Sequence, residues 1–270
     1  MPRALARIDG WPRPRAAAVL VGGEIVDDRG DVDADLPWAS ITKLATALAA
    51  LVAVASGDLG LDDRAGPPGA TVRHLLAHAS GLAFDTADVR APPGARRIYS
   101  NSGYEVLAAT VAAAVSLPFD AWLGTSVLGP LGMTRTRLTG SPAAGLVGPL
   151  ADMVGLAVEL QRPSLLPPGV ATVMREVAFP GLAGLLPGLG HQATNDWGLG
   201  PEVRDAKSPH WTGAHNDPST YGHFGASGAF VWVDPVAGVA CACATGQAFG
   251  PWAKAEWPAL SDAVLAEWSS

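Results

Sequence analysis

The most apolar stretch of the chain runs from Ser40 to Ser56 and reads SITKLATALAALVAVAS. It is rich in Ala and Leu, which favour helices. Gly57 follows it, and glycine commonly ends a helix. Because apolar side chains occupy nearly every side of such a helix, we expect it to be buried rather than amphipathic.

Two polar side chains stand at the start of this helix. Ser40 and Lys43 are three residues apart, so both lie on one helix face and the amine can hydrogen-bond the hydroxyl. A serine hydroxyl becomes a strong nucleophile when a base takes its proton, and an amine desolvated among apolar neighbours can be that base. The backbone N–H groups at a helix N-terminus also favour the negative charge that follows attack on a carbonyl. The alternative is an N-cap serine followed by a solvated lysine.

The composition narrows the class of protein. Of the 270 residues, 49% are apolar and 16% are charged, a balance typical of folded globular chains. The net charge of -7 argues against nucleic acid as a partner. We find no secretory signal and no run of about 20 apolar residues, so we expect a cytoplasmic protein with no membrane partner.

Both ends of the chain carry β-hairpin patterns. Strands are expected at 16–21 and 24–26 around Gly22-Gly23, and at 229–233 and 239–245 around a Pro- and Gly-containing turn. Cys241 and Cys243 lie two apart on the last strand and cannot reach each other, so we expect free, half-buried thiols. A final helix is expected from Trp257 to Trp268, with Pro258 in its first turn.

The middle of the chain is mostly helix and loop, with helices expected at 72–79, 104–116, 119–128 and 151–161. This order predicts an α+β fold: one antiparallel sheet built from the N- and C-terminal segments, flanked by helices, with an inserted all-α lobe. We expect a single domain over residues 1–270. Its sheet subdomain would cover roughly 1–60 and 196–270, and its helical lobe roughly 61–195.

Two further segments carry side chains that can do chemistry. Tyr99-Ser100-Asn101 combines a phenol that can move protons with an amide that can both donate and accept hydrogen bonds. The segment from His223 to Gly228 reads HFGASG, and its glycines would let a substrate approach a strand edge whose free N–H completes an oxyanion hole. Taken singly, the first could be a turn with a helix cap and the second a glycine-rich strand entry.

Together the three segments resemble the serine β-lactamase and penicillin-binding-protein superfamily, nearest to its class C β-lactamase-like, esterase and D-aminopeptidase branch. That family carries Ser-x-x-Lys at the start of a buried helix, Tyr-x-Asn in a loop of the helical lobe, and Lys or His-x-Gly on an edge strand. Residues 72–82, 57–63 and 222–235 resemble other family segments, so the likeness extends over most of the chain. It implies a β-lactamase/transpeptidase-like fold.

The resemblance also implies a role for each matching residue. Ser40 would be the acyl-enzyme nucleophile, Lys43 the proton acceptor paired with Tyr99, and Tyr99 the acid that protonates the leaving group. The oxyanion would lie between the backbone N–H groups of Ser40 and Ala226. The substrate-binding residues implied in the same way are Asn101, His223, Gly225 and Ala226.

Two departures from the family pattern bear on the substrate. His223 stands where β-lactamases and transpeptidases usually carry lysine, and Phe224 replaces a small hydroxyl residue. A neutral imidazole binds a carboxylate more weakly than an ammonium does, because its hydrogen bond is not charge-assisted. The replacement of lysine by His223 therefore favours hydrolysis of a small carboxylic ester. The alternatives are β-lactamase or D-amino-acid peptidase activity and, from another class, a non-catalytic binding module on the same fold. The partner expected is a small ester, lactam or amide, and the oligomeric state stays open.

No cofactor and no metal site is expected. His74 and His78 have the spacing of a helical zinc pair, but Leu75 stands where a metalloprotease would carry its catalytic glutamate. The sequence also lacks a complete Gly-x-Ser-x-Gly elbow, which disfavours an α/β-hydrolase.

Overall fold

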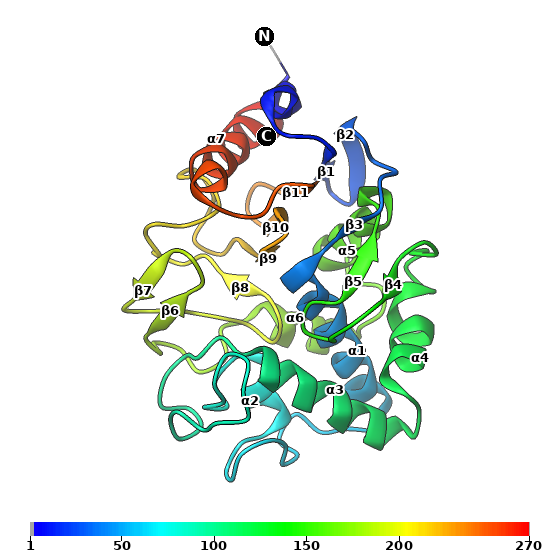
Figure 1. Ribbon diagram of the computed structural model, residues 1–270, viewed down its shortest axis with the longest axis vertical. Coiled ribbons are helices and arrows are strands. Elements are labelled where there is room, and N and C mark those ends of the chain that lie inside the picture. Colours follow the sequence, from blue (N-terminus) through cyan, green and yellow to red (C-terminus); the bar gives the residue numbers. More distant parts are fainter. Residues whose placement is uncertain (1–2, 270) are drawn as a thin grey trace.

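A computed structural model describes residues 3–269 and contains a six-stranded sheet covered by helices on both faces (Figure 1). The strands run in the order β2-β1-β11-β10-β9-β8, and each neighbouring pair is antiparallel. Their bounds are β1 Arg15–Val21, β2 Glu24–Gly30, β8 Glu202–Val203, β9 Tyr221–Gly225, β10 Ala229–Asp234 and β11 Val239–Thr245. N- and C-terminal segments therefore share one sheet, which confirms the predicted α+β fold.

The helices and the smaller strands fill the rest of the chain. The helices are η1 Ala4–Gly10, η2 Ala39–Ile41, α1 Thr42–Ser56, α2 Val72–Leu76, α3 Asn101–Val115, α4 Phe119–Leu123, η3 Gly124–Leu128, α5 Leu150–Gln161, α6 Pro168–Arg175 and α7 Pro251–Trp268. A three-stranded sheet contains β3 Leu36–Pro37, β5 Leu146–Gly148 and β4 Arg137–Leu138, and β6 Gly184–Leu186 pairs with β7 Gly190–Gln192.

Three inner strands of the sheet, β1, β11 and β10, are buried on both faces over almost their whole length. Alternate residues of a strand point to opposite faces. Ala242 belongs to the core formed with α1 and α5, whereas its neighbours Cys241 and Cys243 belong to the core formed with α7. Both thiols are free and fully buried, so the expectation of half-burial was wrong. The physical reason is that α7 covers the face that a hairpin alone would leave open (Figure 1).

Helix α1 is the buried helix that its composition predicts. It ends at Gly57, whose φ of 85° is the left-handed cap conformation that glycine adopts readily. The 18 residues Ala39–Ser56 are apolar and long enough to pass a test for a membrane span, and 67% of them are buried inside the protein. Its buried Thr42 accepts a hydrogen bond from the backbone N–H of Leu146, and Thr46 donates one to the carbonyl of Pro142. The loop after β4 and the first residue of β5 thus satisfy the hydroxyl groups of these two threonines.

Several element boundaries differ from the sequence prediction. Helix α7 begins at Pro251, six residues before the predicted start at Trp257, and Pro258 lies inside it rather than in its first turn. Helix α2 ends at Leu76 because His78 has a positive φ of 55°, which a helix cannot contain. Strand β9 pairs with β10 as the last hairpin that the family resemblance implied, and it begins at Tyr221. Helix α5, within the range expected for the helical lobe, packs against β1 and β11.

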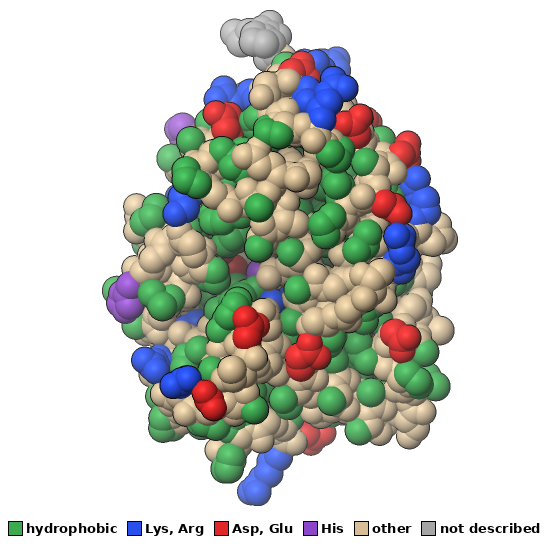
Figure 2. All heavy atoms as spheres, in the orientation of Figure 1, with side chains coloured by type: hydrophobic (Ala, Val, Ile, Leu, Met, Phe, Trp, Pro, Cys, Tyr) green, Lys and Arg blue, Asp and Glu red, His purple; other side chains and the backbone are tan. Residues whose placement is uncertain are grey.

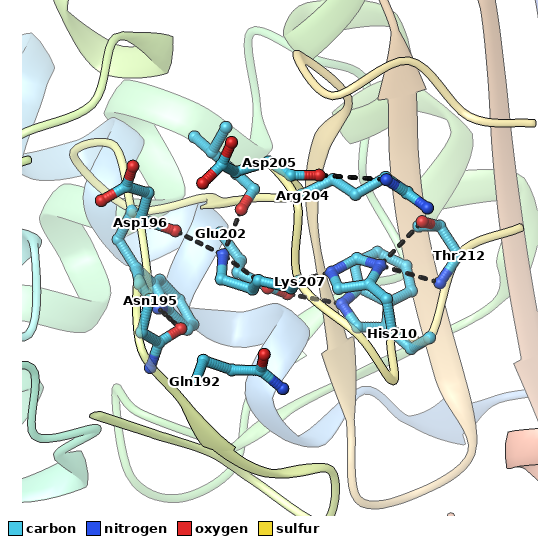
Figure 3. A network of polar contacts seen from close by, with 12 residues as sticks. Gln192, Asn195, Asp196, Glu202, Arg204, Asp205, Lys207, His210 and Thr212 are labelled. Atoms are coloured by element: carbon cyan, nitrogen blue, oxygen red, sulfur yellow. Dashed lines mark hydrogen bonds and ion pairs between the residues drawn. The ribbon is translucent and has the colours of Figure 1, made fainter. Parts of the chain in front are cut away.

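A buried ionic network holds β8 beside β9 (Figure 3). The Glu202 carboxylate lies 3.0 Å from Lys207 Nζ, and both side chains are almost fully buried. His210 Nε2 lies 3.0 Å from the same carboxylate, and the Trp211 indole N–H donates to its other oxygen. Lys207 also donates to the carbonyl of Asp196, at 2.7 Å. The loop from Asp196 to Trp211 is therefore closed around one carboxylate.

We expect Glu202→Gln to lower the free energy of unfolding by about 3–5 kcal/mol, because it leaves the Lys207 ammonium buried without its counter-ion. Burial raises the pKa of the Glu202 carboxyl, but Lys207 and His210 outweigh it and hold this pKa at about 2. A lowered pKa in the folded state means stability that is complete above the ordinary value of 4.5 and is lost as the pH falls toward 2.

Urea denaturation at neutral and acidic pH measures both effects. The matched control is Glu176→Gln, which changes an exposed glutamate. Equal stability of the two variants at neutral pH would contradict the assignment.

Candidate active site

Ser40 lies in a one-turn 3-10 helix, η2, immediately before α1. The residue before it, Ala39, has a φ of 46°, a left-handed conformation that is strained for a residue with a Cβ and that is enriched at functional sites. Trp38 is fully buried and anchors the turn through its indole N–H, which donates to the carbonyl of Gly148 at 3.0 Å. The half-buried Ser40 side chain is thereby held at one end of the sheet.

A cavity of about 220 Å³ opens on Ser40. Its lining is mostly apolar and consists of Ser40, Phe84, Tyr99, Pro187, Gly188, Trp197, His223, Phe224, Ala226 and Phe249. Figure 2 shows a hollow near the middle of the molecule, surrounded by hydrophobic side chains, with basic and histidine atoms visible in its depth. Four of the sequence-predicted site residues, Ser40, Tyr99, His223 and Ala226, line this one space.

The Lys43 amine is fully buried and has three oxygen neighbours. Its Nζ lies 3.3 Å from Ser40 Oγ, 2.6 Å from Asn101 Oδ1 and 2.9 Å from the carbonyl oxygen of Ala143. Burial lowers the pKa of Lys43 to about 7, although Asp85 and Glu105 oppose the shift. A neutral amine has two N–H donors and one lone pair. The two carbonyl oxygens take the donors, which leaves the lone pair to accept the proton of the Ser40 hydroxyl.

Tyr99 remains a protonated phenol in this site. Burial raises the pKa of its hydroxyl well above the ordinary value, and a hydrogen-bond interaction with Ser40 only partly offsets the rise. The Lys43 Nζ lies 4.7 Å from the centre of the Tyr99 ring. Since the pKa of the phenol rises and that of Lys43 falls, the amine is the group able to accept a proton at neutral pH.

His223 faces the same space in a neutral form. Its Nδ1–H donates to the backbone carbonyl of Phe224 at 2.7 Å, so Nε2 carries the lone pair. The Tyr99 hydroxyl lies 3.4 Å from this Nε2. Burial, with a smaller contribution from Lys43, lowers the pKa of His223 to about 3. The position therefore presents a hydrogen-bonding imidazole and no positive charge.

Asn101 does not line the cavity. Its Oδ1 accepts from Lys43, and its Nδ2 donates to Asp85 Oδ1 at 2.7 Å. Both ends of the amide are thus engaged within the protein, and the side chain orients Lys43. Asn101 was expected to bind the substrate. Neither Asp85 nor the Ala143 carbonyl was identified from the sequence, because both come from loops with no motif.

Gly225 and Ala226 lie where β9 meets the Ser40 turn. A Cβ at Gly225 would come within 2.4 Å of the Trp38 carbonyl oxygen, so glycine is required for the strand to approach the turn this closely. Strand β8 pairs only with Tyr221 and Gly222, which leaves the outer edge of β9 open beyond them. Within residues 3–269 the backbone N–H of Ala226 meets no acceptor, and Ser40 lies in a first helical turn, where N–H groups lack intrahelical partners.

His78, which was expected in a family-like segment and weighed as a metal ligand, packs against the site. Its Nδ1 accepts from the backbone N–H of Ser100 at 3.1 Å, and its ring packs against Tyr99 at an angle of 38°, with centres 4.4 Å apart. It therefore fixes the Tyr99 segment. His74 is instead bound to Thr71 Oγ1, and no three His, Cys, Asp or Glu side chains of the described chain lie together as a metal would require.

Comparison with known proteins adds the family context. The family model described as Beta-lactamase matches residues 14–265. A crystal structure of a beta-lactamase from Mycobacterium bovis is 48% identical, with a TM-score of 0.97 over 99% of this chain and 100% of that one. None of the curated proteins compared with the chain matches it.

Two more distant structures share the fold. EstCE1, described as a hydrolase with promiscuous acyltransferase activity, has a TM-score of 0.78 at 19% identity and covers 97% of this chain and 96% of its own. A mutant of the simvastatin synthase LovD from Aspergillus terreus has a TM-score of 0.78 at 16% identity, over 97% and 93% of the two chains.

The geometry around Lys43 predicts how the reactivity of Ser40 depends on pH. A fluorophosphonate probe should label Ser40 at a rate that rises with pH through a midpoint near 7, because only the neutral amine above its pKa can take the hydroxyl proton. Mass spectrometry of the labelled peptide and the rate at each pH measure this. Lys43→Met should abolish the labelling, whereas Ser56→Ala, which changes an exposed serine, should not. A rate that does not change between acidic and neutral pH would refute Lys43 as the base.

Proposed function

Because the chain belongs to the beta-lactamase family and is a serine hydrolase, we propose that it hydrolyses small carboxylic esters through an acyl-enzyme on Ser40. The observation that carries this proposal is the cavity itself. The Ser40 hydroxyl lines a mostly apolar cavity, and the low-pKa Lys43 amine lies 3.3 Å from it. Among the described residues, no lysine or arginine lines this cavity to bind a substrate carboxylate.

Acylation would begin with transfer of the Ser40 proton to Lys43. Ser40 Oγ forms a bond to the ester carbonyl carbon, and the oxyanion that develops is stabilised by the backbone N–H groups of Ser40 and Ala226. The tetrahedral intermediate then collapses with cleavage of the bond to the alcohol oxygen. The Tyr99 hydroxyl, which faces the cavity and stays protonated, gives that oxygen its proton and recovers one from Lys43.

Deacylation would use the same groups in the reverse direction. A water molecule takes the place of the alcohol, loses a proton to the Tyr99 and Lys43 pair, and attacks the acyl carbon. The bond to Ser40 Oγ breaks and the oxygen recovers its proton. The acid product leaves with the hydroxyl restored. Atoms and protons balance over the cycle, and no further reactant is needed.

His223 supports an ester over a lactam. A penicillin-type carboxylate is recognised best by a charged donor, and the imidazole here is neutral with its Nδ1–H already given to a backbone carbonyl. Phe224, Trp197 and Phe249 line the adjoining wall, which favours a small apolar acyl group. Beta-lactamase activity is the second candidate, because the 48% identical relative from Mycobacterium bovis carries that name.

We expect Ser40→Ala to lower kcat/KM for p-nitrophenyl acetate by roughly a thousandfold or more, because the variant has no nucleophile. Wild-type turnover of nitrocefin and of D-alanine p-nitroanilide, measured at the same enzyme concentration, should be far slower than ester turnover. Ser56→Ala serves as the control with wild-type activity. Equal turnover by Ser40→Ala and wild type would refute the mechanism. Faster nitrocefin than ester hydrolysis would favour the second candidate, and an intact protein that forms no adduct with any acylating probe would favour a binding module.

His223→Lys should lower KM for nitrocefin, which carries a carboxylate, by about tenfold, because an ammonium makes a charge-assisted hydrogen bond where neutral imidazole cannot. Steady-state kinetics with nitrocefin and with the neutral p-nitrophenyl acetate separates a carboxylate effect from a general one. The matched control is His215→Lys, whose side chain is 78% exposed. A folded His223→Lys variant with no gain for nitrocefin would contradict the placement of His223 at the carboxylate position.

A further inference from the structure

A second and larger cavity adjoins the one that opens on Ser40. Its volume is about 690 Å³, against about 220 Å³ for the Ser40 cavity. The two share Phe84, Tyr99 and Pro187 as lining residues, so they meet at the Tyr99 ring. Ser40, His223 and Ala226 line only the smaller cavity. A molecule with its reacting carbon at Ser40 could therefore extend past Tyr99 into the larger space.

The β6–β7 hairpin and the loops on either side of Arg97 form the walls. Gly184 of β6 bridges to Arg97, and a Cβ at Gly184 would come within 2.3 Å of the Arg97 carbonyl oxygen. The Arg97 side chain is buried and donates to the carbonyl groups of Ala77, Ala178, Phe179 and Asn195. Its guanidinium therefore holds these loops together, so the cavity wall is fixed by buried hydrogen bonds of the fold.

Apolar side chains are exposed at the mouth of this cavity. Phe84 and Leu185 line it, yet they are 51% and 64% exposed. These are two of the six large hydrophobic side chains exposed in the described chain. Binding of an apolar ligand at the cavity mouth would cover these side chains, which would explain their exposure in the free protein.

The same mouth carries positive charge. Arg90 and Arg96 are both exposed lining residues. Arg90 forms an ion pair with Asp88 at 2.8 Å, whereas Arg96 donates only to the Arg90 carbonyl and has no carboxylate partner among residues 3–269. The lining acid, Asp85, is engaged by Asn101. Figure 2 shows basic side chains below and to the left of the hollow. An unpaired guanidinium beside an apolar space suits a ligand that is apolar along its length and anionic at its end.

We propose that the larger cavity is the leaving-group subsite of the ester hydrolysis proposed above, and that it takes an alcohol whose apolar chain ends in an anion held by Arg96. Tyr99, the proposed donor of a proton to the leaving oxygen, stands between the cavities, so the alcohol side of the ester faces the larger one. Arg96 precedes Tyr99 by three residues, which limits the distance between their Cα atoms to about 10 Å. A carboxylate and a phosphate are both anions that accept hydrogen bonds from a guanidinium, so both fit this terminal position.

The test compares three esters of acetic acid: hexyl acetate, ω-acetoxyhexanoate and ω-acetoxyhexyl phosphate. We expect wild-type kcat/KM for the anionic esters to exceed that for hexyl acetate by about fivefold, through lower KM, with the preference falling as salt is added. A greater gain for one of the two anionic esters identifies the head group. Arg96→Met should bring the ratio of anionic to neutral ester close to one, and Arg96→Lys should restore part of it. The matched control is Arg137→Met, since Arg137 is also exposed and lies on β4 away from the cavity.

The outcomes separate the two proposals. If hexyl acetate is hydrolysed through Ser40 but the wild type shows no preference for the anionic esters, or Arg96→Met keeps the preference, the subsite proposal is overturned and the ester hydrolase stands. If no ester is hydrolysed, the function proposal fails. In that case, the binding of ω-hydroxyhexanoate and of hexanol to Ser40→Ala, measured by calorimetry, decides whether the larger cavity binds an anionic alcohol. Tighter binding of the anionic alcohol that is lost in Arg96→Met supports it, and equal or absent binding overturns it.

Discussion

The buried amine of Lys43 is the constraint on which the rest of the site depends. An ammonium at this depth with no carboxylate in contact is costly, so the environment lowers its pKa to about 7 instead. Its oxygen partners come from three parts of the chain: Ser40 from the turn before α1, Asn101 from the first residue of α3, and Ala143 from the loop before β5. Moving any one of these elements would leave the amine without a partner or the serine without a base.

The sheet supplies the other half of the site, and its approach to α1 is set by backbone contact. Gly225 allows β9 to lie against the Trp38 carbonyl, and this brings Ala226 to the cavity that Ser40 lines. The same strand carries His223, which is neutral because it is buried. One apolar environment therefore lowers the pKa of both Lys43 and His223 and raises that of Tyr99, which separates a base from an acid within a single cavity.

Patterns of local sequence predicted the elements that are long or marked by motifs. Helix α1 and the two hairpins were predicted because an apolar run and glycine turns are local signals, and the α+β fold followed from their order. Other features were decided by distant contacts. Strand β9 has two glycines in five residues and pairs as a strand because β10 binds it, and Cys241 is fully buried because α7 covers that face of the sheet. Helix α7 begins earlier than predicted because Pro251 suits a first helical turn.

By itself, the sequence determined which chemical groups are available: a serine and a lysine one helical turn apart, a phenol, and an imidazole in place of a lysine. Spacing along a helix is a local property, so the contact between Ser40 and Lys43 could be predicted from it. Only the tertiary structure decided how these groups behave. It turned Asn101 toward Lys43, lowered the pKa of the Lys43 amine to about 7, and opened a larger cavity beside Tyr99. Burial and pKa depend on atoms from segments far apart in the chain, and no local pattern specifies them.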